Sequence, residues 1–236
     1  MSLPAIHAID DQWKSLLDPR GPFAFGLDPA TTENEKSNPT GFSVVQIIGN
    51  RYVTRLAARW KTSNPDVTIA ILEEALKLPE NLRPRRLVVD ASNERFFAAD
   101  LRKRFRGKVM VELVSSTQKI KYRGEEMPAK VYLGNQLINI LEDGNLVLPP
   151  AKWLEKDFRL VKRDRGSFTT EVDSNGGHGD VFDAVKLAIH GIGTKGGPAQ
   201  ISAANTGQRF SGSTGNRYPM RPEDVQDDFN NERLSL

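Results

Sequence analysis

The sequence predicts an α/β domain built on a mixed sheet, in which three antiparallel strands come first, parallel strands follow, and helices cover both faces. Two observations carry this prediction. Strand-like apolar runs open the domain in close succession, and the turn pair Gly49–Asn50 joins two of them as in an antiparallel hairpin. After Trp60, helical and strand-like segments alternate, which is typical of parallel strands joined by helical connections.

Composition divides the chain into three parts. We expect residues 1–22 to be a lead-in, because the sequence DPRGP interrupts a short helix-like stretch there. Residues 23–190 carry the strand and helix patterns and form the predicted folded domain. Residues 191–236 are rich in Gly, Ser, Asn and Thr and have little apolar periodicity, so we expect a mostly disordered tail.

The elements of the domain follow from local patterns, in chain order. Strands are predicted at FAFGLD (23–28), GFSVVQIIG (41–49), RYVTRLAARW (51–60), RRLVVD (85–90), KVMVELV (108–114) and SFTTEV (167–172). Helices are predicted at 63–78, 92–105, 129–144, 150–163 and 180–190, and 115–130 is expected to include a loop. Asn64 is the expected N-cap of the first helix, and Gly144 is the expected stop of the third.

Composition also excludes several classes of protein. The chain has no cysteine, which removes disulfides, thiolate zinc sites and cysteine nucleophiles. No apolar run is long enough to span a membrane, and the N-terminal stretch has no apolar signal core. We therefore expect a cytoplasmic protein without a membrane partner.

Basic residues are concentrated in two segments. Residues 83–108 hold nine Lys or Arg against three acidic residues, and residues 152–166 form a second cluster. Such clusters suit a polyanion, because neutralising phosphates releases counterions. A solvated helix face explains either cluster equally well, so neither identifies a nucleic acid by itself.

Three aspartates are predicted to converge at one edge of the sheet. Asp28 and Asp90 each end a predicted strand, and parallel neighbouring strands would bring both carboxylates out together. Asp180, at the start of the closing helix, would add a third. Carboxylate ligands without cysteine suit Mg²⁺ or Mn²⁺. Two such ions about 4 Å apart can activate water against a phosphodiester.

Each candidate also has an ordinary structural interpretation. Asp28 precedes a proline and suits a turn, and Asp90 suits a cap of the following helix. Asp180 suits a helix N-cap, and Asp183 suits the positive end of the helix dipole. His178 is either a contact to a phosphate or a metal-bound water, or an ordinary loop residue. Local pattern leaves these alternatives open.

Three segments together resemble a known family. GLDPA, LVVDASNERFFAADL and GHGDVFDAVKLAIHG are similar to the acidic motifs in the nuclease domain of tailed-phage large terminase subunits, most closely those of Mu-like phages and prophages. The resemblance covers residues 23–190. It implies an RNase H-like fold whose first and fourth strands lie side by side. It also places Asp28, Asp90 and Asp180 on metal-binding carboxylates, with Asp183 as a secondary ligand.

The resemblance further implies a function. It indicates an endonuclease with a two-metal site for Mg²⁺ or Mn²⁺ that cuts concatemeric double-stranded DNA during packaging in the cytoplasm of a bacterial host cell. No G-x-x-x-x-G-K-[ST] phosphate loop is present, so we expect the ATPase domain to be supplied elsewhere. The portal and the small terminase subunit are further expected partners, and the tail is a candidate for docking to them.

The segment 115–130 lies where this family carries a mobile element near its site. Lys119, Lys121 and Arg123 are therefore candidate phosphate contacts, with plain solvent exposure as the alternative. Two other functions also stay open. One is a different RNase H-like nuclease, such as a Holliday-junction resolvase, which would use Asp183 as a fourth carboxylate. The other is a catalytically inactive module that binds DNA or a protein.

Overall fold

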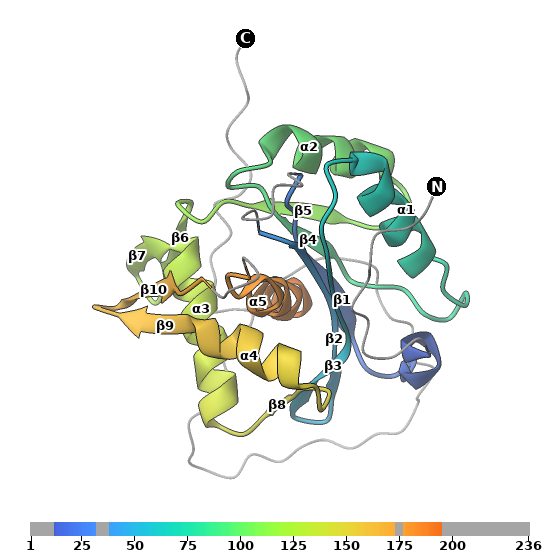
Figure 1. Ribbon diagram of the computed structural model, residues 1–236. Helices are drawn as coiled ribbons and strands as arrows, with labels where there is room; N and C mark the ends of the chain where they lie inside the picture. Colours follow the sequence, from blue (N-terminus) through green and yellow to red (C-terminus); the bar gives the residue numbers. More distant parts are fainter. Residues whose placement is uncertain (1–11, 32–37, 173–176, 195–236) are drawn as a thin grey trace.

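The structure is a computed structural model that describes residues 12–31, 38–172 and 177–194 (Figure 1). Its central sheet has six strands in the order β5-β4-β1-β2-β3-β8, namely β1 (Phe23–Asp28), β2 (Thr40–Ile48), β3 (Arg51–Trp60), β4 (Leu87–Asp90), β5 (Val111–Val114) and β8 (Leu146–Val147). The helices are a 3₁₀ turn (Trp13–Leu16), α1 (Pro65–Ala75), α2 (Arg95–Arg104), α3 (Ala129–Glu142), α4 (Lys152–Leu160) and α5 (Asp180–Gly193). Residues 1–11 of the expected lead-in and 195–236 of the expected tail lie outside the described residues.

The sheet is mixed, as the sequence predicts. β2 is antiparallel to both β1 and β3, and Gly49, with a positive φ of 62°, turns the chain between β2 and β3. β4 lies parallel between β1 and β5. The first and fourth strands are therefore side by side, and their carboxyl ends, Asp28 and Asp90, reach the same edge.

Apolar side chains fill both faces of the sheet. On one face Phe23, Phe25 and Phe42 are buried in a cluster that α1 and α2 cover. On the other face α5 lies against β1, β2 and β4, and α3 and α4 pack on its outer side (Figure 1). Because α5 is enclosed, it is apolar around most of its circumference. Among the described residues, no helix combines the length and apolar character needed to cross a bilayer.

The close approach of α5 to the sheet depends on Gly26. A Cβ added at Gly26 would lie 1.9 Å from the carbonyl oxygen of Ala184 and 2.7 Å from the backbone nitrogen of Ala188. Glycine inside a strand commonly marks such an approach of another backbone. Gly26 therefore sets how deeply α5 seats on β1.

We expect Gly26→Ala to destabilise the fold by about 1–3 kcal/mol or more, because the added methyl group meets backbone atoms and α5 must shift as a body. Urea unfolding followed by circular dichroism measures the change. Gly193→Ala is the matched control on α5, since the nearest atom to its Cβ would be 4.0 Å away. Equal stabilities of the two variants would contradict the close approach.

Two sequence predictions are wrong because the structure has short β-hairpins where the end of a helix and a loop were predicted. The helix predicted over 150–163 ends at Leu160, and β9 (Val161–Asp164) pairs with β10 (Ser167–Thr170). The segment expected to include a loop at 115–130 contains the hairpin of β6 (Lys119–Tyr122) and β7 (Glu125–Pro128). Each hairpin turns through an Arg-Gly pair with positive φ at both residues, at 123–124 and 165–166. Two consecutive residues with positive φ favour the tight hairpin turn that the strand twist requires.

The closing helix is longer than expected, because it continues past His190 to Gly193. A buried polar cluster holds this end. Glu112 of β5 accepts a hydrogen bond from Arg86 at 2.7 Å and lies 2.8 Å from Nε2 of His190. Although burial raises the pKa of Glu112, the His190 hydrogen bond and nearby positive charge lower it overall. The cluster therefore ties the C-terminal part of α5 to β4 and β5.

Candidate active site

Asp28 and Asp90 occupy neighbouring positions at the carboxyl edge of the sheet. Leu27 pairs with Val89 in the parallel register of β1 and β4, so the two aspartates that follow stand on strands about 4.8 Å apart. Leu27 and Val89 belong to the cluster under α1 and α2. Because side chains alternate along a strand, both aspartates point to the opposite face, toward α5.

The start of α5 brings two further aspartates to the same edge. Asp180 and Asp183 are three positions apart and share one face of the helix. A Cβ added at Gly41 would lie 2.2 Å from the carbonyl oxygen of Asp180, and Gly41 is the register partner of Asp28. The packing of α5 on β2 therefore places Asp180 beside Asp28.

The four carboxyl groups interact through their charges. Burial raises the pKa of Asp28 well above its usual range, and the charges of Asp183, Asp90 and Asp180 raise it further. Burial also raises the pKa of Asp180 to about 7, although a hydrogen bond from the backbone N–H of His178 opposes the shift. Repulsion of this kind is relieved when a cation binds.

Lys186 of α5 lies among these carboxyl groups. Its Nζ donates a hydrogen bond to Asp183 Oδ1 at 2.5 Å, and its side chain is 7% exposed. Burial lowers the pKa of Lys186, but the charges of Asp183, Asp28 and Asp90 raise it overall. One ammonium group therefore faces four carboxyl groups, so the ionised site keeps a net negative charge.

The donor set fits a divalent hard cation. Four carboxyl groups without sulfur suit Mg²⁺ or Mn²⁺ better than zinc. Among the residues that the structure describes, no three His, Cys, Asp or Glu side chains are already grouped as metal ligands. The cluster is therefore close enough for strong charge interaction, yet its oxygens do not converge on one point.

Local hydrogen bonds hold three of the carboxyl groups. Asp90 Oδ1 accepts the N–H of Ser92 at 2.7 Å, and Asp180 Oδ2 accepts the N–H of His178 at 3.1 Å. Asp183 Oδ1 accepts from Lys186. Each bond engages one oxygen of its carboxyl group, and a carboxylate has further acceptor sites.

Asp180 is not the N-cap of α5, so the interpretation of this residue as a helix N-cap is wrong. The N-cap is Gly179, with a left-handed φ of 78°, and Asp180 is the first helical residue. The capping hydrogen bond comes from another helix, since Asp157 Oδ1 of α4 accepts the N–H of Phe182 at 2.9 Å. The carboxylate of Asp180 is thus left at the edge of the sheet.

Sequence reasoning missed Asp157 and Lys186. Asp157 lies in a basic, helix-forming segment, and nothing in that segment indicates that its carboxylate reaches another helix. Lys186 offers a weak signal, because it is a single cation within the apolar run VFDAVKLAIHG. A lysine in such a run indicates either a buried ion pair or a helix end.

Asp157 also makes stability depend on pH. Burial raises its pKa from 3.8 to about 6, against the hydrogen bonds from Phe182 and Val181. Because the folded-state pKa lies above the unfolded value, the protonated group stabilises the fold below about pH 4, and this contribution is lost as the pH rises through about 6. Asp157→Asn keeps an acceptor for the N–H of Phe182 but cannot ionise. We therefore expect its free energy of unfolding to fall by up to about 3 kcal/mol less than that of the wild type as the pH rises.

Asp157→Ala is the comparison variant for this prediction. It removes the acceptor, so we expect it to cost about 1–3 kcal/mol through the unpaired N–H of Phe182. Urea unfolding at pH values from 4 to 8, about one unit apart, measures the free energy of unfolding of both variants and of the wild type. Parallel pH profiles for Asp157→Asn and the wild type would contradict the assignment.

The candidate DNA-contact residues follow closely in sequence on elements that end or begin at the carboxylate edge, but their side chains have different environments. The β6–β7 hairpin follows the carboxyl end of β5, which is in register with Asp90. On the hairpin, Lys119 pairs with Glu126 at 3.2 Å, and the guanidinium of Arg123 lies 5.2 Å from the ring centre of Tyr122. Lys121 is exposed. His178, by contrast, is half-buried, and it contacts the site through its backbone.

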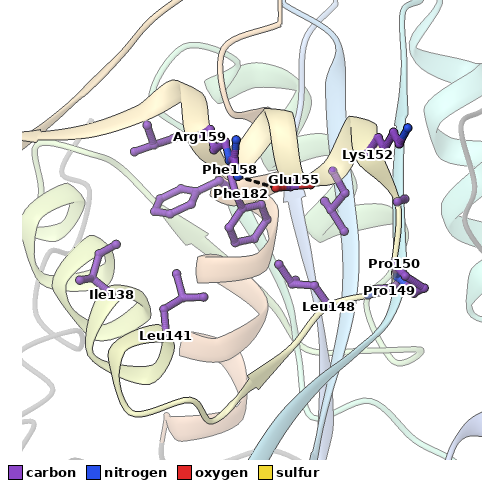
Figure 2. Close-up of a pocket in the computed structure, with 13 residues that line it drawn as sticks. Ile138, Leu141, Leu148, Pro149, Pro150, Lys152, Glu155, Phe158, Arg159 and Phe182 are labelled. Carbon is purple, nitrogen blue, oxygen red and sulfur yellow. Dashed lines mark ion pairs between the residues drawn. The ribbon is translucent and has the colours of Figure 1, made fainter.

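A separate cavity of about 590 Å³ lies between α3, α4 and the start of α5 (Figure 2). Phe158 and Phe182 meet in it with ring centres 5.3 Å apart, and the Glu155–Arg159 ion pair lies beside them. Its lining is mainly apolar, and none of the four aspartates contributes to it. The cavity is therefore separate from the carboxylate cluster.

Comparison with solved structures finds the same fold in viral terminases. No protein-family model matches the sequence, and no curated protein matches it. The large terminase nuclease from thermophilic phage G20c superposes with a TM-score of 0.52 at 16% identity, over 73% of this chain and 83% of that one. The magnesium-bound form gives 0.50 at 14% identity, over 73% and 82%. The large terminase of another thermophilic bacteriophage gives 0.51 at 15% identity, over 76% of this chain and 43% of that one.

The fold and the site together define an RNase H-like domain with a carboxylate cluster at the ends of its central strands. More particularly, the chain has the fold of the large-terminase nuclease domain. The fold that the sequence motifs imply is thereby confirmed.

Proposed function

We propose that this chain is a divalent-metal-dependent endonuclease that cleaves double-stranded phage DNA concatemers during genome packaging. The observation that carries the proposal is the meeting of Asp28, Asp90, Asp180 and Asp183 at one edge of an RNase H-like sheet, around a buried lysine. The likeness to the G20c terminase nuclease, which has been solved with bound magnesium, supports it.

In this proposal the aspartates bind the cations and the lysine balances their charge. Asp28, Asp90 and Asp180 hold Mg²⁺ or Mn²⁺ in a two-metal site, and Asp183 is a secondary ligand. When bound, the cations supply the charge stabilisation that phosphodiester hydrolysis needs. Lys186 offsets the repulsion between the carboxyl groups in the absence of the cations.

Basic side chains beside the site would position the DNA backbone. Lys119, Lys121 and Arg123 of the hairpin are the candidate phosphate contacts, and His178 is a further candidate. Lys121 is the best placed of these, because among the described residues it has no ion pair or ring contact to give up. Phosphate contacts of this kind position DNA without reading its sequence.

The packaging role also implies partners. An ATPase domain would drive DNA movement, and the portal and the small terminase subunit are the proposed docking partners in the cytoplasm of the bacterial host cell. The match over 43% of a large terminase is compatible with an additional domain.

Cleavage of supercoiled plasmid in EDTA, Mg²⁺ and Mn²⁺ tests the proposal. We expect nicking and linearisation with either cation and none in EDTA, together with calorimetric binding of Mn²⁺. Absence of both cutting and metal binding would contradict the enzyme proposal and favour an inactive module that binds DNA or a protein.

A resolvase is the second candidate function. Asp183 favours it, since it brings a fourth carboxyl group into the cluster around Asp28. A four-way DNA junction and a linear duplex of the same arms separate the two functions. Preferential symmetric cutting of the junction would favour the resolvase, and equal cutting would favour the terminase nuclease.

A further inference from the structure

Phe96 is an aromatic side chain that the fold leaves in solvent. It is 95% exposed, whereas its neighbour Phe97 packs against the core under α2. Phe96 is the second residue of α2, and only a short connection separates that helix from Asp90 at the end of β4. The exposed ring therefore stands at the carboxylate edge of the sheet.

Hydrogen bonds fix this connection, so the position of the ring is defined. Glu94 Oε1 accepts hydrogen bonds from Thr31, at 2.6 Å from the hydroxyl and 3.3 Å from the backbone N–H. Ser92 Oγ accepts the N–H of Ser116 at 2.8 Å. These bonds join the start of α2 to the segments that follow β1 and β5. The start of α2, and with it Phe96, is therefore held in a defined position.

An exposed cation lies next to the ring along the helix. Arg95 directly precedes Phe96, is exposed, and has no ion-pair partner within the described structure. Asp100 lies one turn further along α2, whereas Arg102 and Lys103 lie about two turns away, and Arg102 is beside Met110 at the other end of the sheet. An almost fully exposed ring next to Arg95 and close to the carboxylate edge suits a nucleic acid, in which bases lie beside phosphates.

A protein partner fits this surface less well. The buried centre of a protein interface is depleted in charge and contains several apolar residues together. Here one exposed ring stands without another exposed apolar residue on α2, and the charged residues Arg95 and Asp100 lie next to it on the helix. Aromatic side chains, in contrast, stack on unpaired bases or wedge between base steps of a distorted duplex.

We propose that Phe96 stacks on a base of the bound DNA next to the carboxylate site, so that the protein prefers DNA with an unpaired or unstacked base there. The inference rests on the proposed function, because it takes DNA as the ligand. It adds a specificity-determining residue and a substrate class, namely duplex DNA that is locally opened beside the cut.

Fluorescence anisotropy in EDTA tests stacking apart from cleavage. The probes are a fully paired duplex and the same duplex with a short central mismatch bubble. We expect the wild type and Phe96→Tyr to prefer the bubble, and Phe96→Ala and Phe96→Leu to lose that preference by about 5- to 150-fold. Met110→Ala, at an apolar residue that is 47% exposed before β5 and at the other end of the sheet, is the control and should behave as wild type.

The Leu variant decides the chemistry, because it keeps an apolar side chain and removes the aromatic ring. Equal bubble preference in Phe96→Leu and the wild type would overturn stacking and indicate a protein docking site. Equal preference in Phe96→Ala would also overturn it. Phe96-dependent binding without metal-dependent cutting would support stacking while contradicting the endonuclease proposal. Absence of DNA binding by the wild type would overturn stacking, and plasmid cleavage in Mg²⁺ or Mn²⁺ would still test the endonuclease proposal separately.

Discussion

We expect Asp90→Asn to slow metal-dependent plasmid cleavage by about 10²- to 10⁴-fold. A carboxylate ligand contributes several kcal/mol of charge stabilisation through the cations it holds, and about 1.4 kcal/mol corresponds to a tenfold change in rate. The amide keeps an oxygen for the Ser92 N–H, so the local turn is preserved. Removing one charge from a repulsive cluster should also leave the folded state at least as stable. Initial rates of plasmid linearisation and thermal unfolding in EDTA measure the two effects separately.

Asp143→Asn is the matched control for this experiment. Asp143 is exposed at the C-terminal end of α3, next to β8 and away from Asp28 and Asp90, so the same change there should leave the cleavage rate unaltered. Wild-type cutting by Asp90→Asn would show that the site aspartates do not catalyse, or that the cutting comes from a contaminant. Equivalent losses in Asp28→Asn and Asp180→Asn would establish that the three carboxylates act as a unit.

We expect Lys186→Met to cost about 3–5 kcal/mol of stability in EDTA, because it leaves buried carboxyl groups without their cation. Mn²⁺ should restore part of this loss, since a ligand at about 100 times its Kd stabilises the folded state by about 2.7 kcal/mol. Stability should therefore depend on metal more strongly in the variant than in the wild type. Urea unfolding with EDTA and with Mn²⁺ measures both.

Lys77→Met provides the comparison for Lys186. Lys77 pairs with Glu74 at the same three-residue spacing, but both side chains are mostly exposed. We expect that substitution to cost less than about 1 kcal/mol, with the same response to Mn²⁺ as the wild type. Similar losses in the two variants would show that burial among the carboxyl groups is not what makes Lys186 important.

The candidate carboxylates were predictable because each stands at a recognisable boundary. Asp28 and Asp90 end apolar strand-like runs, and Asp180 begins an apolar helix. The roles of Lys186 and Asp157 were not predictable in this way. Their partners come from the packing of α5 against the sheet and α4, and no local pattern reports how deeply a helix seats.

The strands and helices also divide into those that the sequence predicts and those that it does not. The long β2–β3 hairpin and α1 match their patterns, including the cap in which Asn64 Oδ1 accepts the N–H of Asp66. β10 matches the strand or hairpin arm predicted at 167–172. The hairpin at 119–128 and the strand β9 do not match, because four-residue strands carry little periodicity and their Arg-Gly turns are weak signals. β8 is a two-residue strand that is defined by its parallel pairing with β3.

By itself the sequence determined the order of the main strands and helices, the mixed sheet, and the aspartates at the ends of its strands, because these depend on local periodicity and chain order. Only the tertiary structure decided that Asp157 caps α5, that Lys186 lies among the aspartates, and that Phe96 stays in solvent. The first two outcomes depend on how α5 seats against α4 and the sheet, and Gly26 sets the distance between α5 and β1 through backbone contacts far apart in the chain.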